Sequence, residues 1–158
     1  MDLIVDAIQA IQAILAPAVM ITGVALLLLT SNARHSSLVN RIRLLNDEER
    51  VLRRKGDKLD DLDATRLRSI ENQINQLLPR LLYIRNGMLC HLLAAIFFVL
   101  TSFWIGLGYF SISSAVTQAI INVTFMVGML LVLIGVAFLA VEIYVSYRVI
   151  LIETREHE

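Results

Sequence analysis

Residues 87–110 read GMLCHLLAAIFFVLTSFWIGLGYF and residues 119–141 read AIINVTFMVGMLLVLIGVAFLAV, and these two runs decide the fold. No Lys, Arg, Asp or Glu occurs from residue 86 to residue 141. The hydrocarbon core of a bilayer is ~30 Å thick, and about 20 mainly apolar residues cross it as an α-helix. Each run is therefore long enough to span a membrane, and the two predict a pair of transmembrane helices.

A further apolar run covers residues 7–30 and lies between Asp6 and Arg34. A cleaved signal peptide begins with basic residues and has a short apolar core. This segment begins instead with the acidic residues Asp2 and Asp6, and its apolar part is long, so we expect a retained membrane helix. In lipid the backbone must satisfy its hydrogen bonds within the segment, so all three runs are predicted to be helical.

Basic residues predict the orientation of the chain in the membrane. Residues 31–86 contain twelve of the fourteen Lys and Arg residues, and the C-terminal tail contains the other two. The N-terminal residues and the connection 111–118 contain none. Because loops rich in Lys and Arg stay on the cytoplasmic side, we expect the N-terminus outside and residues 31–86 and the tail inside.

The segment 31–86 has heptad spacing on two arms, which is typical of packed helices. The apolar heptad positions, with one polar break at Glu49, are Leu38, Ile42, Leu45, Glu49 and Leu52, then Leu67, Ile70, Ile74, Leu77 and Leu81. Gly56 can end the first arm and Asp63 can cap the second. Glu49 and Arg53 form a favourable i, i+4 pair. We expect an antiparallel, coiled-coil-like helical hairpin that continues the first two membrane helices into the cytoplasm.

The whole chain is therefore predicted to be an all-α membrane protein with three transmembrane helices and a cytoplasmic antiparallel helical hairpin between the first and second. The expected division is an N-terminal transmembrane helix at 1–30, the helical hairpin at 31–86, a two-helix transmembrane hairpin at 87–147 and a cytoplasmic tail at 148–158. The formal net charge is zero, so the composition gives no basis for binding nucleic acid.

The base of the predicted hairpin is basic without any acidic residue, over residues 31–43 and 75–86. Its five arginines are Arg34, Arg41, Arg43, Arg80 and Arg85. We expect them to contact anionic lipid headgroups, because basic residues beside a membrane span are attracted to such lipids. The alternative for Arg41 and Arg43 is a contact with a partner or a nucleotide. Residues 44–74 carry charges of both signs and are expected to be solvated.

A family resemblance enters at the first membrane helix. The run ILAPAVMITGVALLLL (14–29), then NAR (32–34), then LVNRIRLL (38–45), resembles a bacterial integral-membrane family known only as a domain of unknown function. The arginines before the second membrane helix are similar too. The resemblance implies a multi-pass protein of the bacterial plasma (inner) membrane, and it supplies no catalytic residues.

Motifs that carry catalysis are missing from the sequence. It contains no Gly-rich phosphate loop, no His-Glu-x-x-His, no Cys-x-x-Cys and no Gly-x-Ser-x-Gly. A metal site built from Cys90, His91 and Glu142 is disfavoured, because adjacent helical residues point about 100° apart. We therefore expect no enzyme activity, no cofactor and no bound metal.

Small or polar residues recur along one face of the third membrane run. They are Thr124, Gly128, Gly135, Glu142 and Ser146. One interpretation is a pore-lining or ion-relay face with Glu142 near its cytoplasmic mouth. The other is a helix-packing face, whose small residues allow close approach, with Glu142 paired to a nearby Arg. The second interpretation is favoured because Glu142 lies close to the membrane edge.

Two functional hypotheses follow from these features. Three helices cannot enclose a wide transport path, and the internal repeats common in transporters are missing. The leading hypothesis is a homo-oligomeric membrane protein that can form an ion-conducting pore around a shared axis. The alternative is a non-conducting membrane scaffold or accessory subunit, whose hairpin recruits a cytoplasmic protein partner.

Overall fold

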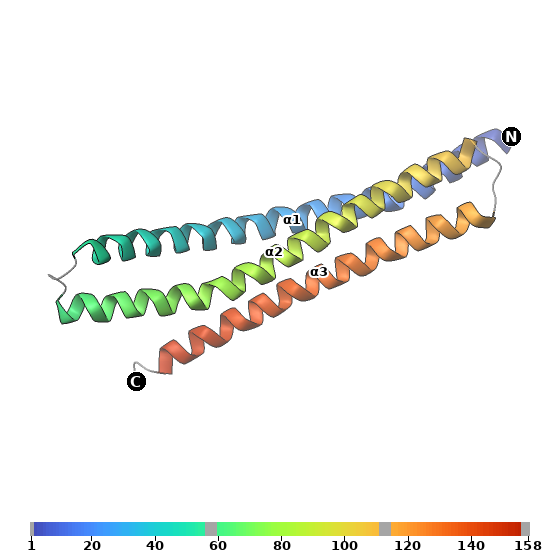
Figure 1. The fold of residues 1–158 in the computed structure, drawn as a ribbon. Coiled ribbons are helices and arrows are strands. Elements are labelled where there is room, and N and C mark those ends of the chain that lie inside the picture. Colours follow the sequence, from blue (N-terminus) through green and yellow to red (C-terminus); the bar gives the residue numbers. More distant parts are fainter. Residues whose placement is uncertain (1, 56–59, 111–114, 156–158) are drawn as a thin grey trace. The chain divides into compact units, whose positions relative to one another are not determined.

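The computed structural model describes residues 2–55, 60–110 and 115–155, and these form three α-helices without any strand (Figure 1). The helices are α1 (Asp2–Arg54), α2 (Asp61–Phe110) and α3 (Ala115–Arg155). Each contains a stretch long and apolar enough to cross a membrane, within Ile14–Arg54, Asp61–Gly108 and Ala115–Ser146 respectively. The prediction of an all-helical chain with three candidate spans is therefore confirmed.

Helices α1 and α2 each combine an apolar run and a charged arm without a break. Pro17 and Pro79 both lie inside these helices. Helix α2 begins at Asp61, whose N–H donates to the carboxylate of Asp60 at 2.9 Å. Asp63 therefore lies inside the helix, and its predicted role as the cap was wrong, because Asp60 provides the capping carboxylate three residues earlier. Gly56, the predicted end of the first arm, lies outside the described residues.

The chain forms two compact units, and all three helices contribute to both. We call Met1–Thr30 with Gly87–Ala137 the apolar unit, and Ser31–Asn86 with Phe138–Glu158 the charged unit. The core of the apolar unit contains Val24, Ala94 and Phe98. The ring of Phe98 packs against that of Phe125 with centroids 5.6 Å apart.

Large apolar side chains also point outward from the apolar unit. Exposed examples occur on all three helices, including Leu26, Phe103, Val123 and Leu133. A soluble protein rarely exposes so much contiguous apolar surface. Outward-facing apolar side chains are expected where lipid tails, rather than water, surround the helices.

The charged unit has its own apolar seam between α1 and α2. Leu45, Leu52 and Ile70 are buried in it, and the partly buried residues packed against them are Leu67, Ile74 and Leu77. All six were predicted as heptad positions, so the periodicity found the seam correctly. Within the chain, the seam lies between the arms contributed by α1 and α2.

Ion pairs flank this seam on its exposed sides. Arg66 pairs with Glu48 at 2.7 Å, and Lys55 pairs with Asp63 at 2.8 Å. The other pairs involve Arg53, which binds Glu49 at 2.7 Å, as the i, i+4 spacing predicted, and Glu71 at 2.6 Å. Water screens the charges of exposed pairs, so each contributes little to stability. The apolar seam therefore supplies most of the stability, and the ion pairs favour one register.

Candidate functional site

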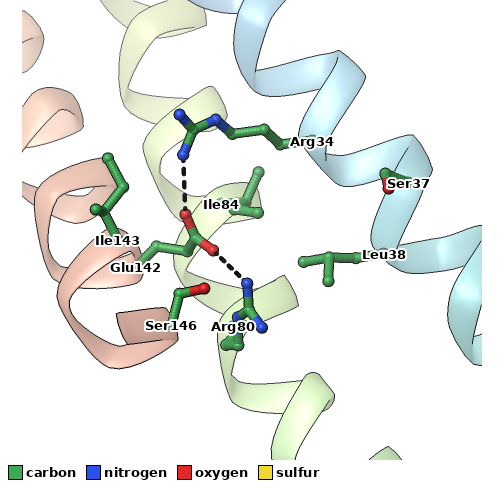
Figure 2. A pocket seen from close by; sticks show the side chains of 8 residues that line it. All are labelled: Arg34, Ser37, Leu38, Arg80, Ile84, Glu142, Ile143 and Ser146. Atoms are coloured by element: carbon green, nitrogen blue, oxygen red, sulfur yellow. Dashed lines mark hydrogen bonds and ion pairs between the residues drawn. The ribbon is translucent and has the colours of Figure 1, made fainter. Parts of the chain in front are cut away.

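A pocket of about 430 Å³ lies in the charged unit, where residues of all three helices meet (Figure 2). We call it the arginine pocket. Its lining residues are Arg34, Ser37 and Leu38 from α1, Arg80 and Ile84 from α2, and Glu142, Ile143 and Ser146 from α3. The pocket therefore joins two residues of the predicted stripe, Glu142 and Ser146, to two of the predicted headgroup arginines.

Glu142 lies between the two arginines, as Figure 2 shows. Its Oε1 accepts a hydrogen bond from Nη2 of Arg80 at 3.2 Å, and its Oε2 accepts one from Nη1 of Arg34 at 3.4 Å. The residue is only 3% exposed. A buried carboxylate needs positive partners, because transfer of an unpaired charge out of water is very costly. The two arginines therefore provide the positive partners that a buried carboxylate needs.

The geometry of these pairs is loose. Strong charge-assisted bonds between N and O atoms are about 2.7–2.9 Å long, and the strongest Arg–carboxylate pairs use two parallel bonds. Here each arginine gives one bond longer than that, to a different oxygen. The Nε atom of Arg80 is buried and has no hydrogen-bond partner among the described residues. The carboxylate thus leaves part of the donor capacity of both guanidinium groups unused.

Each of these three charged residues flanks one of the apolar runs. Arg34 follows the first run, Arg80 precedes the second, and Glu142 follows the third. The other predicted headgroup arginines, Arg41, Arg43 and Arg85, are exposed and do not line the pocket. Arg34 and Arg80 therefore contribute to the pocket, with Arg80 largely buried and Arg34 half exposed, and the other three arginines lie outside it.

The remaining stripe residues on α3 pack against α2 within the apolar unit. The hydroxyl oxygens of Thr124 and Thr101 lie 3.0 Å apart and are hydrogen-bonded. A Cβ added at Gly128 would lie 2.8 Å from the ring of Phe98. At this face the small residues of α3 accept the large side chains of α2, which is the arrangement that small residues permit between membrane helices.

His91 is a buried residue whose packing role the sequence reasoning missed. It is fully buried, and its Nδ1 lies 2.7 Å from the carbonyl oxygen of Gly87. A Cβ added at Gly135 would lie 2.7–3.0 Å from the imidazole ring. One signal was present in the sequence: His91 and Phe98 are seven residues apart on α2, as are Gly128 and Gly135 on α3.

Comparison with known proteins assigns the family of the chain. No curated protein and no solved structure matches it. Residues 14–152 match the family model DUF2721, described as a protein of unknown function, and this range contains every residue of the arginine pocket. The match agrees with the resemblance, noted from the first apolar run and the arginines after it, to a family known only as a domain of unknown function. The chain belongs to the DUF2721 family.

Proposed function

We propose that the protein is a non-conducting, multi-pass membrane scaffold that presents its helical hairpin to a protein partner at the cytoplasmic face of the bacterial plasma membrane. The three apolar helices support membrane insertion. The bias of Lys and Arg toward residues 31–86 supports a cytoplasmic hairpin and an external N-terminus. The scaffold role rests on the hairpin and on the way α3 is packed.

The packing of α3 favours a scaffold over the homo-oligomeric pore. Thr124, Gly128 and Gly135 contact Thr101, Phe98 and His91 of the same chain. A pore lined by this stripe requires α3 to separate from α2, which exposes the buried Phe98 and His91 side chains. The packed arrangement therefore uses Thr124, Gly128 and Gly135 for contacts with α2, and this favours packing over pore lining for that part of the stripe.

The observation that carries the docking role is an apolar pair on the surface of the hairpin. Leu44 and Val51 are 66% and 61% exposed, although their neighbours Leu45 and Leu52 are buried in the seam. Residues seven apart lie on the same face of a helix, so Leu44 and Val51 form one short apolar ridge. Such a ridge is the kind of surface that an amphipathic partner helix covers with its apolar face.

Photocrosslinking tests this ridge. A photoreactive amino acid at residue 44 or 51 is expected to give one discrete adduct with another protein in intact cells. The matched controls are residues 43 and 50, the adjacent positions of α1, where Arg43 and Arg50 are exposed. Adducts of equal yield from all four positions, or adducts between copies of this chain alone, would contradict a partner that docks on the ridge.

The same proposal is tested for conduction in vesicles. The purified full chain, reconstituted into liposomes, is expected to give proton and K⁺ flux no greater than protein-free liposomes. Native mass spectrometry of the same sample gives the copy number. Flux above the control together with a closed ring of several copies would restore the pore hypothesis and overturn the proposed scaffold.

A further inference from the structure

We propose that the arginine pocket is a binding site for a phosphate group, with Arg34 and Arg80 as its anion-binding residues. The site does not depend on the proposed docking role of the hairpin, which involves other residues. Three features of the pocket favour this ligand: its charge, its unused hydrogen-bond donors and its partly apolar walls.

The charge of the pocket favours an anion. Two guanidinium groups and one carboxylate line it, which leaves one positive charge in excess among the described lining residues. Arg80 is only 20% exposed at its side chain, so water screens its charge poorly. An added anion therefore neutralises a positive charge that Glu142 alone does not balance.

The donors of the pocket fit phosphate oxygens. A guanidinium group has five N–H donors in a planar fork, and this fork suits bidentate binding of phosphate. Among the described residues, Arg34 and Arg80 each donate one hydrogen bond, to Glu142. The buried Nε of Arg80 has no partner. Ser37 and Ser146 add hydroxyl groups to the lining.

The apolar wall indicates which phosphate compounds fit. Leu38, Ile84 and Ile143 line the same pocket, and Ile143 is exposed. A phosphodiester with an apolar tail can place its charge between the arginines and its tail against these side chains. The arginines and Glu142 also lie at the ends of the apolar runs, which is the level of lipid headgroups. The ligand chemistry is therefore a phosphodiester or free phosphate, and the lipid source is favoured.

Glu142 has a positioning role in this site. Its carboxylate repels an anion, but it also draws the guanidinium groups of Arg34 and Arg80 toward each other. A ligand phosphate then binds the donors that Glu142 leaves unused, rather than replacing the carboxylate. Ser146 lies one turn beyond Glu142 on α3 and lines the same pocket.

The test uses the full chain purified in non-ionic detergent, with phosphatidylglycerol and inorganic phosphate as the probes. Native mass spectrometry is expected to show a single tightly retained phosphatidylglycerol on the wild type. Arg80→Gln and Arg34→Gln are each expected to weaken retention about tenfold or more, because each removes charge-assisted hydrogen bonds. Arg34 is half exposed at its side chain, so Arg34→Gln keeps the test valid where Arg80→Gln fails to fold.

Arg43→Gln and Arg85→Gln are the matched controls, because they remove the same charge outside the pocket. They are expected to leave retention within about twofold of the wild type. Displacement of the lipid by an equal concentration of inorganic phosphate would support the site and identify free phosphate as its ligand. Retention of the lipid would support the site and identify the lipid headgroup as its ligand. The proposal is overturned where neither probe binds the wild type, or where the control variants weaken binding as much as Arg34→Gln.

Discussion

Gly135→Ala is expected to destabilise the protein by about 1–3 kcal/mol, the usual effect of overpacking a close contact. A Cβ at this position would meet three atoms of the His91 ring at 2.7, 2.8 and 3.0 Å. The ring is fully buried and bonded through Nδ1 to Gly87, so it has little freedom to move aside. Unfolding in mixed micelles, followed by the fluorescence of the single Trp104, gives the measurement.

Two further variants make this prediction sharp. Gly106→Ala is the matched control, since a Cβ there has no atom within 4 Å. Ala is the better helix former, so this change is expected to be neutral or to stabilise by about 0.5–1 kcal/mol. In a His91→Ala background the ring is gone, and Gly135→Ala is then expected to behave like the control. An equal loss of stability in both backgrounds would show that the His91 ring is not what Gly135 accommodates.

The helices and the seam were predictable because their signal is local and periodic. Leu45 and Leu52 are seven residues apart on α1, as are Ile70 and Leu77 on α2, and a buried face on each arm follows from that spacing. The start of α2 was predicted three residues late, because Asp60, Asp61 and Asp63 are all suitable caps by residue type. Only the observed backbone and side-chain bonds of Asp60 distinguish among them.

The arginine pocket was not predictable as a unit, because its residues come from three helices. Arg80 and Arg85 are alike in type and both precede the second apolar run, yet only Arg80 lines the pocket. Which of them does so depends on the rotation of α2 about its axis, and five residues along a helix correspond to a rotation of about 140°. For the same reason, the seven-residue spacing of His91 and Phe98 and of Gly128 and Gly135 predicts contacts only once α2 and α3 are known to pack together.

Glu142→Gln is expected to destabilise the protein by about 2–4 kcal/mol, because breaking a buried ion pair leaves its partner charge without compensation. Glu142 is almost completely buried, and Arg80 is only 20% exposed at its side chain. Glutamine keeps the size of the side chain and one acceptor oxygen but removes the charge between the two guanidinium groups. The expected loss stays below the largest known values, since Arg34 is half exposed and water can solvate it.

Glu71→Gln is the matched control. It tests whether the loss of stability depends on the burial of the ion pair or on its length. Glu71 binds Arg53 at 2.6 Å, a shorter pair than either pair of Glu142, but both side chains are about half exposed. Water screens the charges of exposed pairs, so Glu71→Gln is expected to destabilise the protein less than Glu142→Gln although its pair is shorter. Adding Arg80→Gln to Glu142→Gln is expected to cost little more or to restore some stability, because it removes the uncompensated charge. Equal losses from Glu71→Gln and Glu142→Gln would show that Glu142 is solvated like a surface residue, and that the arginine pocket is not the buried charge cluster that joins the three helices.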